Sequence, residues 1–168
     1  MDEPTPAAHD DAPLIIWIDA DGVPRLVKET VFKAAIRLGL PVVAVANRWM
    51  ELPRSSLLRQ VVVDQGMDVA DDYIVKHCRS GDVVISSDIP LAAEAVAKGA
   101  FVLQHRGELL DAANVRQRLA MRDFMEEMRA GGQASGGPPP YSASDRQAFA
   151  NALDRLLSRR IRELASKG

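Results

Sequence analysis

The chain alternates between short apolar runs and longer segments with helical periodicity. Apolar runs of strand length predict five strands, at residues 14–18, 41–46, 59–64, 82–85 and 100–103. Apolar residues at i, i+3 and i+4 spacing predict helices between them, at residues 24–38, at 69–79 and from about residue 90. Because strands that alternate with helices form parallel sheets covered on both faces, we predict a three-layer α/β/α fold. The expected five-stranded, mostly parallel sheet has the doubly wound order 3-2-1-4-5.

The two ends of the chain have a different character. Residues 1–13 carry three prolines and four acids without apolar periodicity, which predicts a disordered tail. Residues 14–168 are then one α/β domain, with a sheet core at 14–104 and a helical extension at 105–168. The extension contains a helix at 111–130, a Gly/Pro-rich loop at 131–143 and a last helix that packs across the sheet. The start signal of this last helix is a capping box formed by Ser144 and Gln147. A short helix is also possible at 55–58, between the second and third predicted strands.

Composition places the chain among ordinary globular proteins. Hydrophobic residues make up 47% and charged residues 26% of 168 residues, enough for one domain with a real core. The single cysteine, Cys78, rules out an internal disulfide. No apolar stretch is long enough to span a membrane and the first residues lack a signal-peptide pattern, so we expect a cytoplasmic protein without a membrane partner. The oligomeric state stays open between monomer and homodimer.

The charge is unevenly distributed. The net charge of −2 argues against a strongly electrostatic nucleic-acid binder. Residues 1–104 nevertheless hold 10 basic and 15 acidic side chains, whereas residues 105–168 hold 11 and 8. A basic C-terminal third beside an acidic sheet is compatible with an anionic polymer that a metal ion bridges to the sheet.

Two of the predicted strands end in acidic turns. Asp19 and Asp21 follow the first strand, and Asp88 follows the fourth, each turn leading through a proline into a helix. Strands one and four are neighbours in the predicted order, across the point where ligands bind in open α/β sheets. We therefore expect these three carboxylates to lie together.

Each acid also has a structural interpretation. Asp21, Ser87 or Asp88 can cap the helix that follows it, because carboxylates and hydroxyls accept hydrogen bonds from free amides at a helix start. Asp71 and Asp72 open the helix at 69–79, where negative charge suits the helix dipole. Both interpretations stay open for these residues.

A divalent cation would resolve the repulsion between clustered carboxylates. All-oxygen ligation, with no cysteine or histidine set available, selects Mg²⁺ or Mn²⁺ over zinc. Such a site activates water for attack on a phosphodiester, which is nuclease chemistry with RNA as the expected substrate. The candidate catalytic residues are Asp19, Asp21 and Asp88, and Asp71 and Asp72 are further candidate metal ligands. The candidate substrate contacts are Ser86, Ser87, Lys28, Arg106, Arg116 and Arg122.

The chain also resembles a known family. The motifs that carry the likeness lie at residues 19–24 (DADGVP), 87–92 (SDIPLA), 106–109 (RGEL), 121–125 (MRDFM), 136–139 (GGPP) and 145–151 (DRQAFAN). Together they resemble the YaiI/YqxD family of functionally uncharacterised bacterial proteins. The family's sheet is similar to that of PIN-like nucleases, which implies Asp19, Asp21 and Asp88 as metal-facing residues and Asp71 or Asp72 as a further ligand. The family usually has Ala-Cys where this chain has Gly22-Val23, so no thiol is available at that position.

Two other functions are compatible with the same residues. The Asp-x-Asp turn resembles haloacid-dehalogenase-type phosphatases, in which Asp19 would be the nucleophile, Asp21 the general acid, Ser86 or Ser87 the phosphate-binding hydroxyl and Lys98 the lysine that follows it. The order of the motifs argues against it, because the acidic pair precedes the serines and Lys98 instead of following them. A non-catalytic module that binds RNA or a metal is the third hypothesis, with phosphate contacts in arginines such as Arg106, Arg116 and Arg122.

Overall fold

The computed structural model describes residues 11–132, 137 and 139–167. Within these residues the strands are β1 (Ile16–Asp19), β2 (Val42–Ala46), β3 (Leu58–Val62), β4 (Val83–Ile85), β5 (Phe101–Leu103) and β6 (Leu109–Leu110). The helices are α2 (Arg25–Leu38), α3 (Val69–His77), α4 (Ile89–Ala97), α5 (Val115–Ala130) and α6 (Ala143–Lys167). Residues 1–10 of the tail predicted at 1–13, residues 133–136 and 138 of the Gly/Pro-rich loop, and residue 168 lie outside the described residues.

The sheet has the order β3-β2-β1-β4-β5-β6, so the predicted order of five strands is confirmed and one strand is added. Neighbouring strands from β3 to β5 are parallel, and β1 pairs with β4 through Ile16–Val83 and Ile18–Ile85. β6 is antiparallel to β5. This strand has two residues and no periodicity that a sequence could reveal, and it forms because a turn at Gly107 folds the chain back on β5. The predicted sheet of five strands lacked this sixth strand, which lies at the edge.

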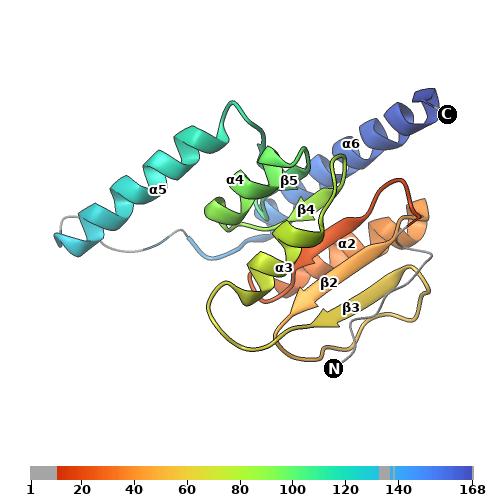
Figure 1. Cartoon of the computed structure of the whole chain (residues 1–168), viewed down its shortest axis with the longest axis horizontal. Coiled ribbons are helices and arrows are strands. Elements are labelled where there is room, and N and C mark those ends of the chain that lie inside the picture. The colour runs from red at the N-terminus through yellow and green to blue at the C-terminus, as the bar shows by residue number, and fades with distance from the viewer. Residues whose placement is uncertain (1–10, 133–136, 138, 168) are drawn as a thin grey trace.

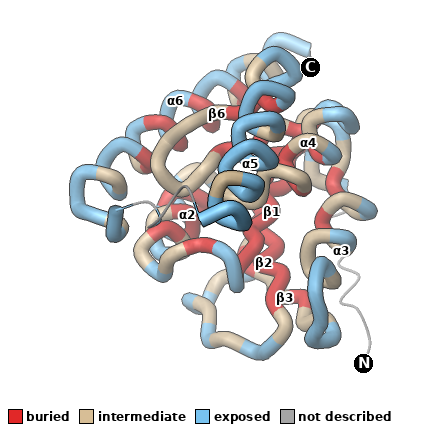
Figure 2. The backbone as a smooth tube through the Cα atoms, turned by 90° about the vertical axis from the view of Figure 1, so that its left-hand side faces the viewer, coloured by how far each residue is buried: buried red, intermediate tan, exposed pale blue. Residues whose placement is uncertain are grey.

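Helices cover both faces of the sheet, which confirms the three-layer fold (Figure 1). Alternate residues of β1 point to opposite sides, as strand geometry requires. Ile16 and Ile18 pack with the apolar residues of α2 and α6, whereas Trp17 packs with those of α3 and α4. The central strands therefore form the buried middle of the molecule (Figure 2).

Helix α6 packs across the sheet as predicted, through Phe149, Leu153, Leu156 and Leu157. Helix α5 is different, because its contacts are with α4 and it extends away from the sheet (Figure 1). Among its residues only Val115 is buried. In the part of the chain that the structure describes, no helix is both long and apolar enough to cross a membrane.

Local side-chain hydrogen bonds place the starts of α5 and α6 differently from the prediction, and one predicted short helix is a turn. The capping box of α6 is formed by Ser142 and Asp145 rather than by Ser144 and Gln147. Helix α5 begins four residues later than predicted, because the Asp111 carboxylate accepts hydrogen bonds from the amides of residues 113 and 114 in a turn. The short helix at 55–58 was wrong, since this segment is a turn that leads directly into β3.

Candidate functional site

Asp19 lies at the carboxyl end of the central strand β1 and is 7% exposed. The Ser86 hydroxyl donates a hydrogen bond of 3.1 Å to its Oδ2 atom. Burial raises the pKa of Asp19, the charges of Asp88 and Asp21 raise it further, and the Ser86 hydrogen bond opposes them. The carboxylate lies so close to Gly22 that a Cβ atom there would be 2.5 Å from Oδ2. Asp19 is thus a buried acid with other acids as its charged neighbours.

Asp21 is exposed and holds two loops together. Its Oδ2 atom accepts a 2.7 Å hydrogen bond from the backbone amide of Asn47, which follows β2. The capping interpretation of Asp21 was wrong, because the N-cap of α2 is Pro24 and no side chain caps that helix. The Asp-x-Asp turn is therefore tied to the end of β2 instead of to the helix that follows it.

Asp88 combines the capping role with a place in the acidic group. Its Oδ1 atom accepts a hydrogen bond of 2.9 Å from the amide of Leu91, which caps α4. Its own amide donates to the Ser86 hydroxyl at 3.1 Å, so Ser86 links the turns after β1 and β4. The capping interpretation is confirmed for Asp88, and the same residue also faces Asp19.

Asp71 faces this group from the first turn of α3, whereas Asp72 does not. Burial, a hydrogen bond with Asp88, and the charges of Asp88, Asp19 and Asp68 raise the pKa of Asp71 to about 7. Asp72 lines the neighbouring groove with Tyr73 instead. Adjacent residues on a helix point in directions about 100° apart, so only one of the pair can face the group. Of the predicted acids, the structure brings together Asp19, Asp21, Asp71 and Asp88.

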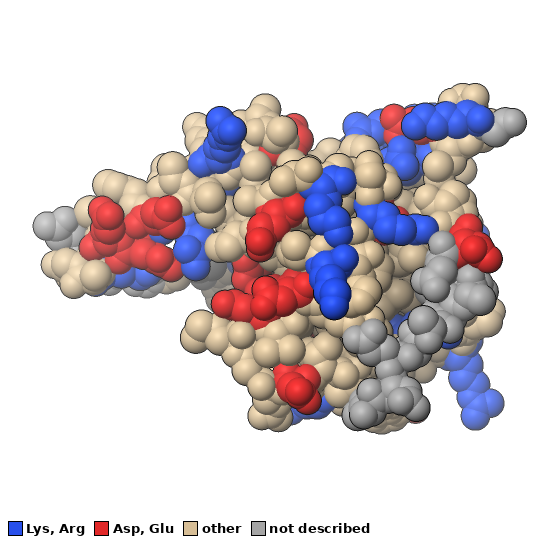
Figure 3. All heavy atoms as spheres, in the orientation of Figure 1, with Lys and Arg blue, Asp and Glu red and all other residues tan. Residues whose placement is uncertain are grey.

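These residues line a cleft of about 230 Å³ at the carboxyl ends of β1 to β4. Acidic side chains gather on this part of the molecule (Figure 3). Two further acids of the cleft, Asp64 and Asp68, were missed by sequence reasoning. Asp64 follows a strand, a signal that could have found it, and Asp68 has the uncommon left-handed conformation with φ of 66°. The residues that line the cleft are Asp19, Asp21, Gly22, Asn47, Asp64, Gly66, Asp68, Ala70, Asp71 and Asp88.

The donor set consists of carboxylate oxygens, which fits Mg²⁺ or Mn²⁺ and not a soft metal. Within the described residues, no three acidic, histidine or cysteine side chains are already arranged as a metal-binding group. Asp71 lies beside Asp88, and this proximity is one of the causes that raise the pKa of Asp71 to about 7. The cleft therefore has the ligand chemistry that a hard cation requires.

The predicted serine contacts have other roles. Ser86 is fully buried and holds Asp19, so it positions a candidate ligand and does not face the cleft. Ser87 is hydrogen-bonded to the His105 ring, whose pKa is lowered by burial and by Arg106. A neutral imidazole nitrogen can accept a hydrogen bond from the hydroxyl, so this contact joins the loop after β4 to the loop after β5.

The predicted basic contacts are mostly engaged elsewhere. Lys28 donates to the carbonyl of Ala20 at 3.0 Å and so steadies the Asp-x-Asp turn. Arg106 pairs with Asp145 at 2.7 Å, at the start of α6. Arg122 pairs with Glu126 on α5, and Arg116 is exposed on the same helix. None of these four residues lines the acidic cleft.

The fold and the cleft define an open α/β protein with clustered carboxylates at the switch point of a parallel sheet. The chain belongs to the uncharacterised YaiI/YqxD family, whose profile matches residues 17–159. Similar proteins, each named UPF0178 protein, occur in Shewanella amazonensis (54% identity over 86% of this chain and 97% of the relative) and in Geobacter metallireducens (53% over 89% and 96%). A third, from Saccharophagus degradans, is 49% identical over 88% of this chain and 98% of its own.

Proposed function

We propose that the protein is a nuclease that uses Mg²⁺ or Mn²⁺ to hydrolyse phosphodiester bonds, with RNA as the expected substrate. The observation that carries the proposal is the convergence of acids from three separate loops on one cleft, with Asp19 buried among them. Among the residues that the structure describes, no lysine or arginine lines the cleft. Carboxylates crowded in this way repel one another unless a cation is shared between them. Such a cation would polarise a phosphodiester and activate a water molecule for in-line attack.

The surrounding residues organise the ligands. Ser86 orients Asp19, and the Asn47 amide orients Asp21. The Asp88 carboxylate accepts a hydrogen bond from the Leu91 amide in the first turn of α4, and this bond fixes its orientation. Above its raised pKa of about 7, Asp71 becomes a negatively charged oxygen donor beside Asp88. These residues thus supply the charge and the orientation that a hard cation requires.

Two exposed apolar side chains favour a nucleic acid over a small substrate. Trp49 is 73% exposed on the loop after β2, and Met67 is 91% exposed on the loop after β3. Both loops contribute residues to the acidic cleft, Asn47 in one case and Gly66 and Asp68 in the other. Exposed aromatic side chains stack on the bases of single-stranded nucleic acids. A single strand that enters the cleft can therefore place its bases on this rim.

The geometry is less favourable for a phosphatase. The lysine that would bind phosphate, Lys98, lies at the C-terminal end of α4 and donates to the carbonyls of Val75 and Lys76. Asp88 is the N-cap at the opposite end of that helix, roughly 15 Å from Lys98 by helical rise. The Ser86 hydroxyl is buried against Asp19. Neither residue is placed to hold a small phosphate ester in the cleft.

The first test is calorimetric titration of Mn²⁺ into three folded proteins. We expect binding to the wild type, loss of binding in Asp19→Asn/Asp88→Asn, and unchanged binding in the control Asp123→Asn/Glu127→Gln. Both doubles remove two acids, but the control pair lies on α5, outside the cleft. Asparagine caps helices as well as aspartate does, so the fold of α4 is kept. Equal binding by both doubles would rule out the cleft as the metal site.

The second test separates the three functions. Incubation of labelled single-stranded RNA with the protein and Mn²⁺ should yield cleavage that the cleft double abolishes and the control double does not. RNA binding without cleavage by any folded form would support the non-catalytic module instead. Hydrolysis of a small phosphate monoester, with a phosphate mimic trapped on Asp19, would support the phosphatase.

A further inference from the structure

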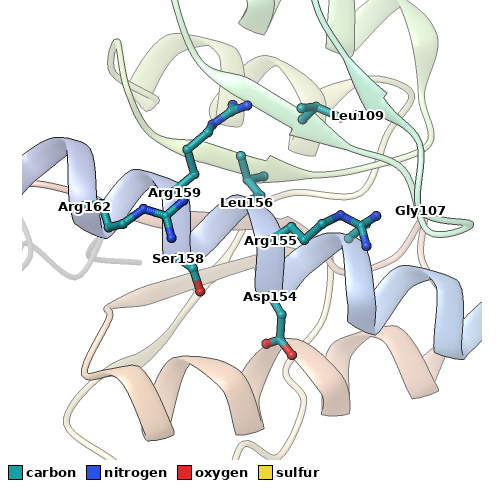
Figure 4. Close-up of a pocket in the computed structure, with 9 residues that line it drawn as sticks. Gly107, Leu109, Asp154, Arg155, Leu156, Ser158, Arg159 and Arg162 are labelled. Carbon is teal, nitrogen blue, oxygen red and sulfur yellow. The ribbon is translucent and has the colours of Figure 1, made fainter.

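A second hollow, of about 560 Å³, lies between α6 and the edge strand β6. Three arginines of α6 line it, Arg155, Arg159 and Arg162 (Figure 4). Their i, i+4 and i+7 spacing places them on one face of the helix, and all three are exposed. In Figure 4 the side chain of Arg155 extends toward Gly107 and that of Arg159 toward Leu109. The hollow, called the α6 arginine pocket below, is thus built from one helix and one sheet edge.

The guanidinium groups of this pocket form no ion pairs in the part of the chain that the structure describes, although the charge of Arg159 helps to lower the pKa of Glu163. Within the described residues, none of the three forms an ion pair, whereas the neighbouring Arg160 is buried and pairs with Glu163 at 2.9 Å. Asp154 also lines the pocket, but it pairs with Arg37 at 2.8 Å. From Asp154 to Lys167 the helix carries five basic and two acidic side chains. The pocket therefore presents uncompensated positive charge.

One of the arginines is already held in place. The Arg159 guanidinium lies 5.3 Å from the centre of the Phe101 ring, a cation–π contact from β5. An arginine fixed in this way loses less freedom when it binds an anion, and its planar fork matches two oxygens of a phosphate group. The chemistry of the pocket is therefore that of a phosphate-binding site.

One loop connects this pocket to the acidic cleft. His105 contacts Ser87, which directly precedes the cleft residue Asp88, and Gly107 of the same loop lines the α6 arginine pocket. The loop is rigid at this point, because Arg106 between them pairs with Asp145 and the Tyr141 hydroxyl donates to the carbonyl of His105 at 2.8 Å. From Gly107 the pocket extends along α6 to Arg159, which lies over Phe101 at the start of β5, whereas the cleft lies at the carboxyl ends of the strands. A ligand that reaches both sites must therefore follow the sheet edge from one end to the other, which a chain of phosphates can do and a single small phosphate compound cannot.

We infer that the α6 arginine pocket binds backbone phosphates of the nucleic-acid strand whose cleavage the acidic cleft is proposed to perform. The inference rests on the proposed function for its choice of strand, but the pocket acts without metal. Sequence reasoning placed the phosphate contacts on α5 and its neighbourhood, at Arg106, Arg116 and Arg122. Within the described residues, three arginines that form no ion pair and share one hollow are on α6.

The test measures binding in the presence of a metal chelator, so that cleavage plays no part. Fluorescence anisotropy of a labelled single-stranded RNA is recorded with the wild type, with Arg155→Gln/Arg159→Gln/Arg162→Gln, and with the control Arg54→Gln/Arg129→Gln/Arg146→Gln. Both triples remove three exposed positive charges, so general attraction changes equally. Circular dichroism and thermal unfolding of each protein establish that the variants are folded.

We expect the pocket triple to weaken RNA binding at least about tenfold more than the control triple does. The slope of log K against log salt should also fall by about 2, since each phosphate contact on a single strand contributes about 0.7. Inorganic phosphate and a mononucleotide should compete only at far higher concentrations than RNA.

Three results would overturn the inference. Equal weakening by both triples would mean that the charge acts without a defined site. No binding of RNA by the folded wild type would remove the strand as ligand. Tight binding of the mononucleotide, lost in the pocket triple, would identify a small phosphate compound as the ligand. The two proposals can fail separately. If the pocket binds RNA but the protein neither binds Mn²⁺ nor cleaves RNA, only the nuclease proposal fails.

Discussion

Two aspartates are buried at opposite ends of the paired strands β1 and β4, and their surroundings differ. Asp82, directly before β4, is 0% exposed and accepts hydrogen bonds from the Ile15 amide, the Trp17 indole and the Arg79 amide and guanidinium, at 2.9–3.2 Å. Asp19, at the end of β1, has one side-chain donor, Ser86, and its charged neighbours are acids.

The comparison separates a structural acid, Asp82, from a candidate functional one, Asp19. A buried carboxylate is stable when donors and an opposite charge replace its water, which is the case for Asp82. Asp19 keeps a burial cost that its partners do not offset, and acids are placed around it. Titratable groups perturbed in this way cluster at functional sites, so the excess of negative charge around Asp19 is a better guide to function than burial.

The largest effect on stability is expected for Asp82→Ala. The substitution removes the acceptor of the buried Ile15 amide and Trp17 indole and the acid that pairs with Arg79, which should lower the free energy of unfolding by about 3–5 kcal/mol. Urea denaturation measures it. The control Asp154→Ala removes an exposed ion pair with Arg37 and should cost less than about 1 kcal/mol. Similar losses in the two variants would contradict the role assigned to Asp82.

Asp19→Asn should have the opposite effect on stability and raise the free energy of unfolding. Because burial, Asp88 and Asp21 disfavour the charged form of Asp19, a neutral amide of the same shape should raise the free energy of unfolding by about 1 kcal/mol at pH 8. The same denaturation experiment measures this gain beside the loss of Mn²⁺ binding. A destabilisation as large as that of Asp82→Ala would show that Asp19 is a structural acid as well.

The raised pKa of Asp71 predicts how the metal-free stability depends on pH. The folded state keeps the proton up to a pKa of about 7, whereas the unfolded state releases it near 3.8. The folded state thus binds more protons between these values, so the free energy of unfolding falls as pH rises from about 4 to about 7 and then levels off. With allowance for solvent screening, we expect this contribution to be about 1 kcal/mol.

Asp71→Asn is the matching variant, because it removes the titrating group and keeps its shape. Denaturation across that pH range should show a smaller decrease than in the wild type. Asp72→Asn is the control, since Asp72 lies one residue away and outside the cleft. An unchanged pH profile in Asp71→Asn would assign the titration to other groups.

The smallest effect is expected for Gly22→Ala. The new Cβ atom would be 2.5 Å from Oδ2 of Asp19, so the carboxylate must turn away from Ser86. We expect a loss of about 0.5–1 kcal/mol in unfolding free energy, the net value of one hydrogen bond, and weaker Mn²⁺ binding. Gly137→Ala, where a Cβ atom meets nothing within 4 Å, serves as control. Unchanged Mn²⁺ binding in Gly22→Ala would mean that the orientation of Asp19 does not matter.

The amino-acid sequence by itself determined the order of five strands, the helices between them and the meeting of Asp19, Asp21 and Asp88. These follow from local patterns, because apolar runs, turn residues and right-handed crossovers leave few topologies. Once β1 and β4 are neighbours, the acids that follow them must share one edge of the sheet.

Only the tertiary structure decided the rest, and the physical reason is that each remaining feature depends on contacts between distant segments. The choice of Asp71 over Asp72 depends on the rotation of α3 over the sheet. The pairing of Arg106 and the free charge of the α6 arginine pocket depend on where α6 crosses the edge strand. The different roles of Asp19 and Asp82 depend on partners up to 67 residues away, which no local pattern encodes.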